Sequence, residues 1–444
     1  MSVWARERIL ALAPDAASVV PAQQLARAGR WSDTGCTERA LWGRCQGSGR
    51  TPYQTVVDLG PTPAYACSCP SRKLPCKHAL ALLLRWSGGQ VAPVPTEAGF
   101  AAEWLRARSA RNLSGPETPA AVVDPEAAAR RAAARADKVN AGLDDLELWL
   151  HDQIRSGLAG VERAGYAHFD RVAARMVDAQ APGLATMLRS IPAELASDGW
   201  PARVLERLAA LHLLVRAHRQ LDTLPAELAA NVRSRVGYPV AKAEVLAQPG
   251  VRDHWMALGS VDTVEYQLES RRVWLYGTSS GRWALWLTFA APGAGLDNAV
   301  VPGQLLHADL HFYPGSGFRA VLGEELDATV PEPATAAALP TEDFAEVVRR
   351  FAGLLARDPW ASRMPALVAA APAAPERPAG PWRLRDAAGH CVDLLGLQGD
   401  PWPLLARAGG EPVAIFGEWT REGLRPLSVL PDRHGATFST ALAA

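Results

Sequence analysis

The chain has 444 residues, 48% of them hydrophobic and 21% charged, so it is long enough for two or three domains with buried cores. These values exclude an intrinsically disordered or fibrous protein. The 46 Lys and Arg residues balance 46 Asp and Glu residues, but residues 1–90 hold 11 of the basic and only 5 of the acidic ones. This first segment therefore has a net charge of +6 and the remainder −6, so overall neutrality does not exclude a polyanionic partner.

Hydropathy and cysteine content restrict the location and the chemistry. No stretch approaches the roughly 18 consecutive apolar residues of a membrane span, and charges interrupt the N-terminal sequence MSVWARERIL where a signal peptide needs its apolar core. We therefore expect a soluble, cytoplasmic protein. Six cysteines without a secretion signal are too few for a disulfide scaffold, which leaves metal binding or inert thiols.

Residues 1–88 are predicted to form three strands followed by a helix. The strand-like runs are 41–45, 53–59 and 64–69, and Gly and Pro residues mark the turns between them. The pattern then changes at residues 78–86, which form an apolar helix that ends at a pair of glycines.

Residues 89–123 are predicted to be a linker with a short helix, and residues 124–250 to be a helical domain. Asp124, Pro125 and Glu126 supply an N-cap, a first-turn proline and a first-turn acid, as at the start of a long helix. Its predicted apolar face contains Val139, Leu143, Leu146, Leu150 and Ile154.

Residues 251–444 are predicted to be rich in β-structure. Residues 272–289 alternate in polarity around a turn at 278–281, which indicates a hairpin. We expect a helix at 341–356 and, because they contain six prolines, a loose connector at 359–381. The predicted fold class is therefore α+β: a small three-strand-plus-helix module, an all-α middle region and a β-rich C-terminal region.

One motif in the first segment carries chemistry. Cys67-Ser-Cys69-Pro-Ser-Arg-Lys-Leu-Pro-Cys76-Lys-His78 has the pattern C-x-C-x6-C-x-H. Alternate residues of a strand point to one face, so the first two thiolates lie together, and the loop returns the other two ligands from the start of a helix. Three thiolates and one imidazole make a closed tetrahedral set, which is typical of a structural zinc rather than a catalytic one. A module of this size buries little core alone, so we expect zinc to fold it.

The alternatives to a zinc site are unconnected core cysteines or a redox pair. Two cysteines separated by one residue on a strand are poorly placed for a mutual disulfide, and four ligands within twelve residues favour the zinc interpretation. Cys36, Cys45 and Cys391 lack such neighbours, and we interpret them as inert thiols.

The motif and its surroundings resemble the SWIM zinc finger family. The segment Gly47-Ser-Gly49-x-x-Pro52-Tyr53, together with the four ligands, is similar to the bacterial branch of that family, and residues 142–150 and 175–184 are similar to the helical body of bacterial SWIM-containing proteins. The resemblance implies that Cys67, Cys69, Cys76 and His78 bind Zn2+. It also implies DNA binding or protein contacts, because SWIM modules occur in transposases, remodelling-type ATPases and ubiquitin ligases.

Several cations surround the motif and are candidate contacts for nucleic acid or for a protein partner. They lie in the zinc loop, on the helix after it and on the preceding hairpin: Arg72, Lys73, Lys77, Arg85, Arg44 and Arg50. Such a cluster could neutralise several phosphates. A solvated basic face, or contact with an acidic protein, is the alternative, because no recognition-helix signature indicates base readout.

Two further groups are interpreted as structural. His307, Asp309 and His311 share one strand face, but no fourth ligand can be placed. The hairpin tryptophans 274, 283 and 286 are more typical of sheet packing than of base stacking. The sequence contains no P-loop, dinucleotide fingerprint, nucleophile elbow or His-Glu-x-x-His motif, so we expect a protein that is not an enzyme.

Two hypotheses of function follow. In the first, the zinc finger binds nucleic acid (DNA) or a protein partner. In the second, the chain is an assembly scaffold or adaptor without nucleic-acid contact, and its partners would be AAA-type ATPases or von Willebrand A-type proteins. These partner classes are implied only by the resemblance, since the bacterial proteins it points to are often encoded beside them.

Overall fold

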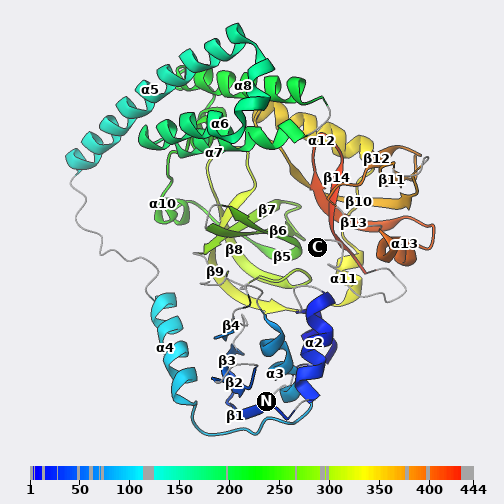
Figure 1. Ribbon diagram of the computed structural model, residues 1–444. Helices are drawn as coiled ribbons and strands as arrows, with labels where there is room; N and C mark the ends of the chain where they lie inside the picture. The colour runs from blue at the N-terminus through cyan, green and yellow to red at the C-terminus, as the bar shows by residue number, and fades with distance from the viewer. Residues whose placement is uncertain are drawn as a thin grey trace.

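The computed structural model describes residues 4, 6–12, 16–27, 29–47, 51–59, 64–69, 71, 75–113, 125–196, 199–265, 268–290, 296, 300–375, 380–396 and 401–431. Helices and strands are mixed as the α+β prediction requires, with strands near the N-terminus, a helical middle and a β-rich C-terminal region (Figure 1). Each region has its own hydrophobic core.

The N-terminal module contains a four-stranded antiparallel sheet in the order β1-β2-β3-β4. Its elements are α1 (Arg6–Ala11), α2 (Ala16–Arg27), β1 (Trp31–Cys36), β2 (Ala40–Cys45), β3 (Tyr53–Asp58), β4 (Ala64–Cys67), α3 (Lys77–Ser87) and α4 (Gly99–Leu113). The sheet has one strand more than predicted. β1 was missed because its sequence, WSDTGC, is polar and its first half is largely exposed, so the apolar alternation that indicates a strand is absent.

Helix α3 forms the centre of this module's main core. Leu80, Leu83 and Trp86 are buried in one cluster with residues of α1, α2 and the sheet. The indole of Trp86 meets that of Trp4 edge to face, with ring centroids 6.0 Å apart. On the other side of the sheet, Trp42 packs in a smaller cluster with α4. The module therefore buries more apolar surface than its predicted size suggested.

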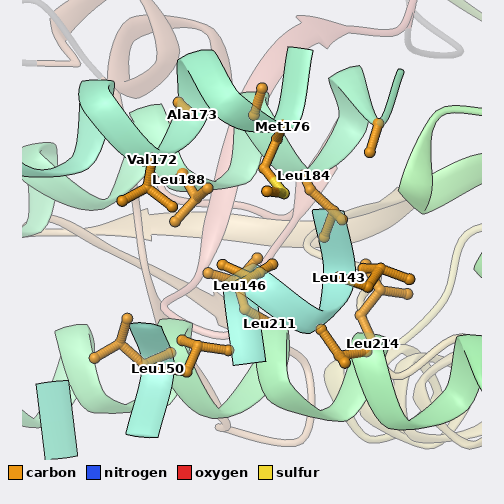
Figure 2. Packing of buried hydrophobic residues seen from close by; sticks show 14 of the residues in the cluster. Leu143, Leu146, Leu150, Val172, Ala173, Met176, Leu184, Leu188, Leu211 and Leu214 are labelled. Atoms are coloured by element: carbon orange, nitrogen blue, oxygen red, sulfur yellow. The ribbon is translucent and has the colours of Figure 1, made fainter. Parts of the chain in front are cut away.

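The helical domain is held by side chains that meet from five helices. Its elements are α5 (Pro125–Ser156), α6 (Val161–Asp178), α7 (Pro182–Ser190), α8 (Trp200–His218), α9 (Ala226–Val236) and α10 (Lys242–Leu246). Figure 2 shows Leu143, Leu146 and Leu150 of α5 facing residues of α6, α7 and α8. The predicted face of α5 is confirmed at these positions, whereas Ile154, two residues before the end of α5, is 57% exposed.

Residues 251–329 form a closed five-stranded barrel in the order β5-β6-β7-β9-β8. Its strands are β5 (Val251–Glu265), β6 (Leu268–Gly277), β7 (Trp283–Ala290), β8 (Leu305–Phe312) and β9 (Arg319–Thr329). The predicted hairpin is β6 and β7. The barrel closes because β7 also pairs in parallel with β9, Leu285 lying opposite Arg319. This order, with one parallel pair, is that of the Greek-key barrels of the OB type.

The C-terminal unit is a second sheet, in the order β12-β11-β10-β13-β14. Its elements are α11 (Pro333–Ala337), α12 (Phe344–Arg357), β10 (Met364–Ala373), β11 (Arg383–Asp386), β12 (Cys391–Asp393), α13 (Trp402–Ala408), β13 (Val413–Trp419) and β14 (Leu424–Val429). The helix predicted at 341–356 is α12, which begins at Phe344 because Asp343 and Glu346 form a capping box.

The prediction of a loose connector at 359–381 was wrong, because this segment contains β10, the central strand of the sheet. Prolines are tolerated there because β10 pairs with β13 over Met364–Ala370 and with β11 over Ala370–Ala373. Pro365 and Pro372 therefore each lie where β10 has a neighbouring strand on one side only, as in an edge strand, where proline is tolerated.

The C-terminal sheet covers part of the outer face of the barrel. Phe416 and Leu427 pack in one cluster with Trp274 and Met256. Gly259 permits this approach, since a Cβ atom there would lie 2.8 Å from the Phe416 ring and 2.9 Å from Leu427.

A buried carboxylate ties the barrel to the C-terminal sheet. Glu418 is 1% exposed and accepts hydrogen bonds from Trp274 Nε1 at 3.0 Å and from Arg363 at 3.2 Å. Arg272 completes the cluster at 3.4 Å. Because Trp274 and Arg272 belong to the barrel, this carboxylate joins two units that are far apart in the sequence.

The helical domain is attached to both β-units by polar contacts. Arg235 of α9 pairs with the buried Asp358 at 2.6 Å, and Trp360 donates from Nε1 to the Ala210 carbonyl at 2.9 Å. Asn231 donates to Ser316 in the loop after β8 at 2.7 Å. Within the part of the chain that the structure describes, no helix is long and apolar enough to cross a membrane.

Candidate metal centre

The four predicted ligands meet where β4 ends and α3 begins. Cys67 is the last residue of β4 and lies opposite Thr55 of β3. Ser68 continues this pairing, because its N–H donates to the Gln54 carbonyl and its hydroxyl accepts from the Gln54 N–H, and Cys69 follows in a bend. Cys76 is the N-cap residue of α3 and His78 lies in its first turn.

The donor atoms are close enough to share one metal ion. Cys67 Sγ lies 3.7 Å from His78 Nδ1, and Cys76 Sγ lies 4.0 Å from the same nitrogen. The ligand atoms of Cys67, Cys69, Cys76 and His78 all lie within 4.8 Å of one another. Tetrahedral zinc with ordinary bond lengths needs S···N edges of about 3.6 Å and S···S edges of about 3.8 Å. The residues present therefore fit zinc, and a bound ion would cross-link β4 to α3.

Burial and neighbouring groups fix the orientation of the ligands. Cys76 is 1% exposed and His78 is 4% exposed. The hydroxyl of Thr55, which is fully buried, lies 3.3 Å from Cys67 Sγ and can donate to the thiolate. The ring of Tyr53 lies against that of His78, with centroids 5.0 Å apart. Thr55 was not predicted as a partner of the ligands, although its strand register opposite Cys67 would have indicated it.

The ligand side chains differ in their pKa values and therefore in how strongly they hold a proton. Hydrogen bonds from Cys67 and Cys76 hold the pKa of Cys69 far below its usual range, so it is a thiolate. Hydrogen bonds to Cys67 and Cys69, together with burial, raise the pKa of Cys76 far above its usual range. Burial lowers the pKa of His78, but hydrogen bonds to Cys67 and Cys69 outweigh it and raise the pKa to about 9. Zinc binding therefore has to displace protons from Cys76 and His78.

The three remaining cysteines are free thiols at separate places. Cys36 and Cys45 are buried and Cys391 is exposed. Burial raises the pKa of both Cys36 and Cys45, which keeps these thiols protonated and agrees with their interpretation as inert. Cys391 stands at the start of β12, where its thiol approaches the Gly389 carbonyl at 3.8 Å.

Of the six predicted contact residues, the structure describes Arg44, Lys77 and Arg85, while Arg50, Arg72 and Lys73 lie outside the described residues. Lys77 is exposed in the first turn of α3. Arg44 pairs with Asp33 at 3.1 Å. Arg85 Nη1 donates to the Ala26 carbonyl near the end of α2 at 2.9 Å, so this guanidinium also supports the fold.

Two further clusters of possible metal ligands lie among the described residues. On the barrel, the ring of His307 stacks on that of His254 at 4.6 Å, while Asp309 pairs with Arg252 at 2.7 Å. Between α5 and α8, donor atoms of Glu147, His151 and His212 also lie within 4.8 Å of one another.

Neither cluster forms a closed metal site. The carboxylate of Glu147 is already paired with Arg219 at 2.6 Å. On the barrel face, Asp309 likewise has a cationic partner, which agrees with the structural interpretation of that strand.

The Cys3His set, closed and placed between a strand and a helix, defines a structural zinc finger. A family model described as SWIM zinc finger matches residues 56–87, and one described as SWIM-associated four-helix bundle domain matches residues 134–236. The chain is therefore a SWIM-domain-containing protein. No curated protein and no solved structure matches the chain.

Proposed function

We propose that the SWIM finger contacts nucleic acid, DNA in the first instance, through phosphate groups, and that the chain is not an enzyme. The observation that carries this proposal is the place of Lys77. It is exposed, whereas its neighbours Cys76 and His78 are buried ligands. Zinc would therefore hold this ammonium, and the first turn of α3, in a fixed position at the surface.

Two acidic groups of the N-terminal module are either paired or buried. Asp33 pairs with Arg44, and Asp58 is only 6% exposed. Lys77 has no ion-pair partner among the described residues, so its charge is available to a ligand. Three thiolates and one Zn2+ add a net charge of −1 beside it, so a phosphate contact also requires the loop cations Arg72 and Lys73.

The barrel is a less suitable site for nucleic acid than the finger, because its tryptophans are covered. Barrels of this type bind oligonucleotides on the outer face of their second and third strands, which here are β6 and β7. Trp274 is 1% exposed on that face, and Trp283 stacks on Phe416 of the C-terminal sheet at 5.5 Å. These tryptophans pack within the chain and are not available to stack on bases.

The test is a fluorescence-anisotropy titration of the zinc-loaded full chain with duplex DNA, single-stranded DNA and RNA at about 50 and about 200 mM salt. A wild-type chain that uses Arg72, Lys73 and Lys77 should show a steep salt slope. Lys77→Gln should reduce the slope for duplex DNA by about 0.9, and the triple change of Arg72, Lys73 and Lys77 to Gln by about 2.7.

The matched control is Lys138→Gln, which removes an exposed lysine from α5, outside the finger. It should leave affinity and slope unchanged. No binding at low salt, or equal losses for the two lysine variants, would contradict the proposal and favour the protein-assembly alternative with ATPase-type partners. The proposal includes a cytoplasmic location, because three zinc-binding thiols are best preserved in a reducing compartment.

A further inference from the structure

A pocket of about 650 Å³ lies in the helical domain, between one face of α5, the end of α8, and α9 with the segment after it. Its walls are partly apolar, with Leu143, Leu221 and Pro239 among the lining residues. Figure 2 shows Leu143 in the packed core of the domain, so the base of the pocket rests on rigid structure. The volume suits a small organic molecule.

Three arginines line this pocket, and among the described residues only one of them is paired with carboxylates. Arg219 is neutralised by Asp144 at 2.7 Å and by Glu147 at 2.6 Å. Arg135 donates through Nη2 only to backbone carbonyls, those of Gln180 and Gly237. Neither Arg135 nor Arg233 has a carboxylate partner among the described residues. Asp222 is the other acidic lining residue, and it is exposed.

An aromatic ring holds the two unpaired arginines together. The guanidinium of Arg135 lies over the ring of Tyr238 at 5.4 Å, and that of Arg233 at 5.6 Å. Such contacts orient a cation without neutralising it, because the ring carries no net charge. Both positive charges therefore remain available to an anion in the pocket.

The same pocket contains two buried polar atoms that have no hydrogen-bond partner in the described part of the chain. They are Arg135 Nε and His218 Nδ1. His218 is 6% exposed, and its Nε2 lies 3.0 Å from the Tyr238 hydroxyl. Burial and the charge of Arg233 lower the pKa of His218, and burial raises the pKa of Tyr238, so both groups are neutral near pH 7. When the hydroxyl donates to Nε2, Nδ1 carries the proton and is a second unused donor.

We propose that this pocket binds a small organic molecule through an oxyanion group, a carboxylate or a phosphate. Arg135 and Arg233 supply the charge, and guanidinium groups present only donors, which match the acceptor-only oxygens of such a group. The apolar walls receive the organic part of the ligand. This site is independent of the zinc finger and of its proposed contact with nucleic acid.

The test is a calorimetric titration of the full, zinc-loaded chain with three probes: phenyl phosphate, benzoate and uncharged benzyl alcohol. Either anion should bind with saturation, and benzyl alcohol should bind at least about tenfold more weakly. The ratio between phenyl phosphate and benzoate distinguishes a phosphate ligand from a carboxylate ligand.

Arg233→Gln is the decisive variant, since this exposed side chain has no hydrogen bond within the fold among the described contacts. It should weaken anion binding at least about tenfold. Arg216→Gln removes an exposed arginine of the same charge from α8, away from the pocket, and should have no effect.

Absence of saturable anion binding, equal affinity for benzyl alcohol, or equal effects of the two arginine variants would each overturn the proposal. Cys76→Ser, which removes a zinc ligand, should bind the anion as the wild type does. This last measurement separates failure of the pocket from failure of the finger.

Discussion

The zinc finger and the helical domain achieve rigidity in different ways. In the finger, the order of the β4–α3 junction depends on four side chains within twelve residues, which lie close enough to share one ion. In the helical domain, order comes from apolar side chains brought together from α5, α6, α7, α8 and α9 over most of the domain's length. The first arrangement depends on metal and protons, and the second depends on close packing. Changes that affect one should leave the other intact.

The largest expected effect is that of Cys76→Ser on the finger. Removing one thiolate opens the closed ligand set, so zinc is lost and the β4–α3 junction loses its cross-link. Because Leu80, Leu83 and Trp86 also pack on α1 and α2, we expect the damage to begin at the junction. Limited trypsin digestion should then cleave after Lys77 and Arg85.

The helical domain serves as an internal reference in the same digestion, because it should stay resistant in the Cys76→Ser chain. Cys391→Ser serves as the matched control because it removes an exposed thiol that is not a ligand. Equal protease resistance in the two variants despite loss of zinc from Cys76→Ser would show that the finger does not depend on its metal, whereas equal zinc content would contradict the assignment of Cys76 as a ligand.

A second, smaller effect is the loss of zinc affinity in acid. The pKa of His78 is raised to about 9 in the metal-free site and that of Cys76 is raised further, so both groups carry protons at neutral pH. Zinc must displace these protons, so affinity rises with pH, by a factor of about ten per pH unit for each of them, and the His78 contribution levels off above pH 9. Competition with a chromophoric chelator at several pH values measures this slope. A pH-independent affinity would contradict the proton assignment.

The smallest expected effect concerns the helical domain alone. A Cβ atom at Gly183 would collide with the carbonyl oxygen of Arg235, so the backbones of α7 and α9 meet there with no space for a side chain. Gly183→Ala should lower the free energy of unfolding by about 1–3 kcal/mol, as overpacking does. Thermal unfolding followed by circular dichroism measures the loss. Gly160→Ala, with no atom within 4 Å of the added carbon, is the control, and zinc content should be unchanged in both.

The zinc ligands could be predicted from sequence because their chemistry is local. The spacing of Cys67, Cys69, Cys76 and His78 contains the whole ligand set, and the turn that places it is marked by prolines. The β6–β7 hairpin and the apolar face of α5 were predicted for the same reason, since each follows from one period within one segment.

Features that depend on distant residues could not be predicted in this way. Closure of the barrel needs β7 to pair with β9, although β8 lies between them in the sequence, and nothing within either strand indicates that partner. β10 was missed because its two prolines are typical of a connector. They fit a strand only because β13 and β11 pair with different parts of β10, which the sequence does not show. The pocket joins Arg135, His218 and Arg233, which approach only after the helices pack.

The buried carboxylate of Glu418 determines where this chain can be divided. Its partners Trp274 and Arg272 lie on the barrel, while Glu418 itself and Arg363 lie on the C-terminal sheet. A fragment that ended after β9 would leave Arg272 without its carboxylate and would expose the apolar face that Phe416 covers. Expression of the barrel by itself should therefore give aggregates, so the two units have to be expressed as one piece.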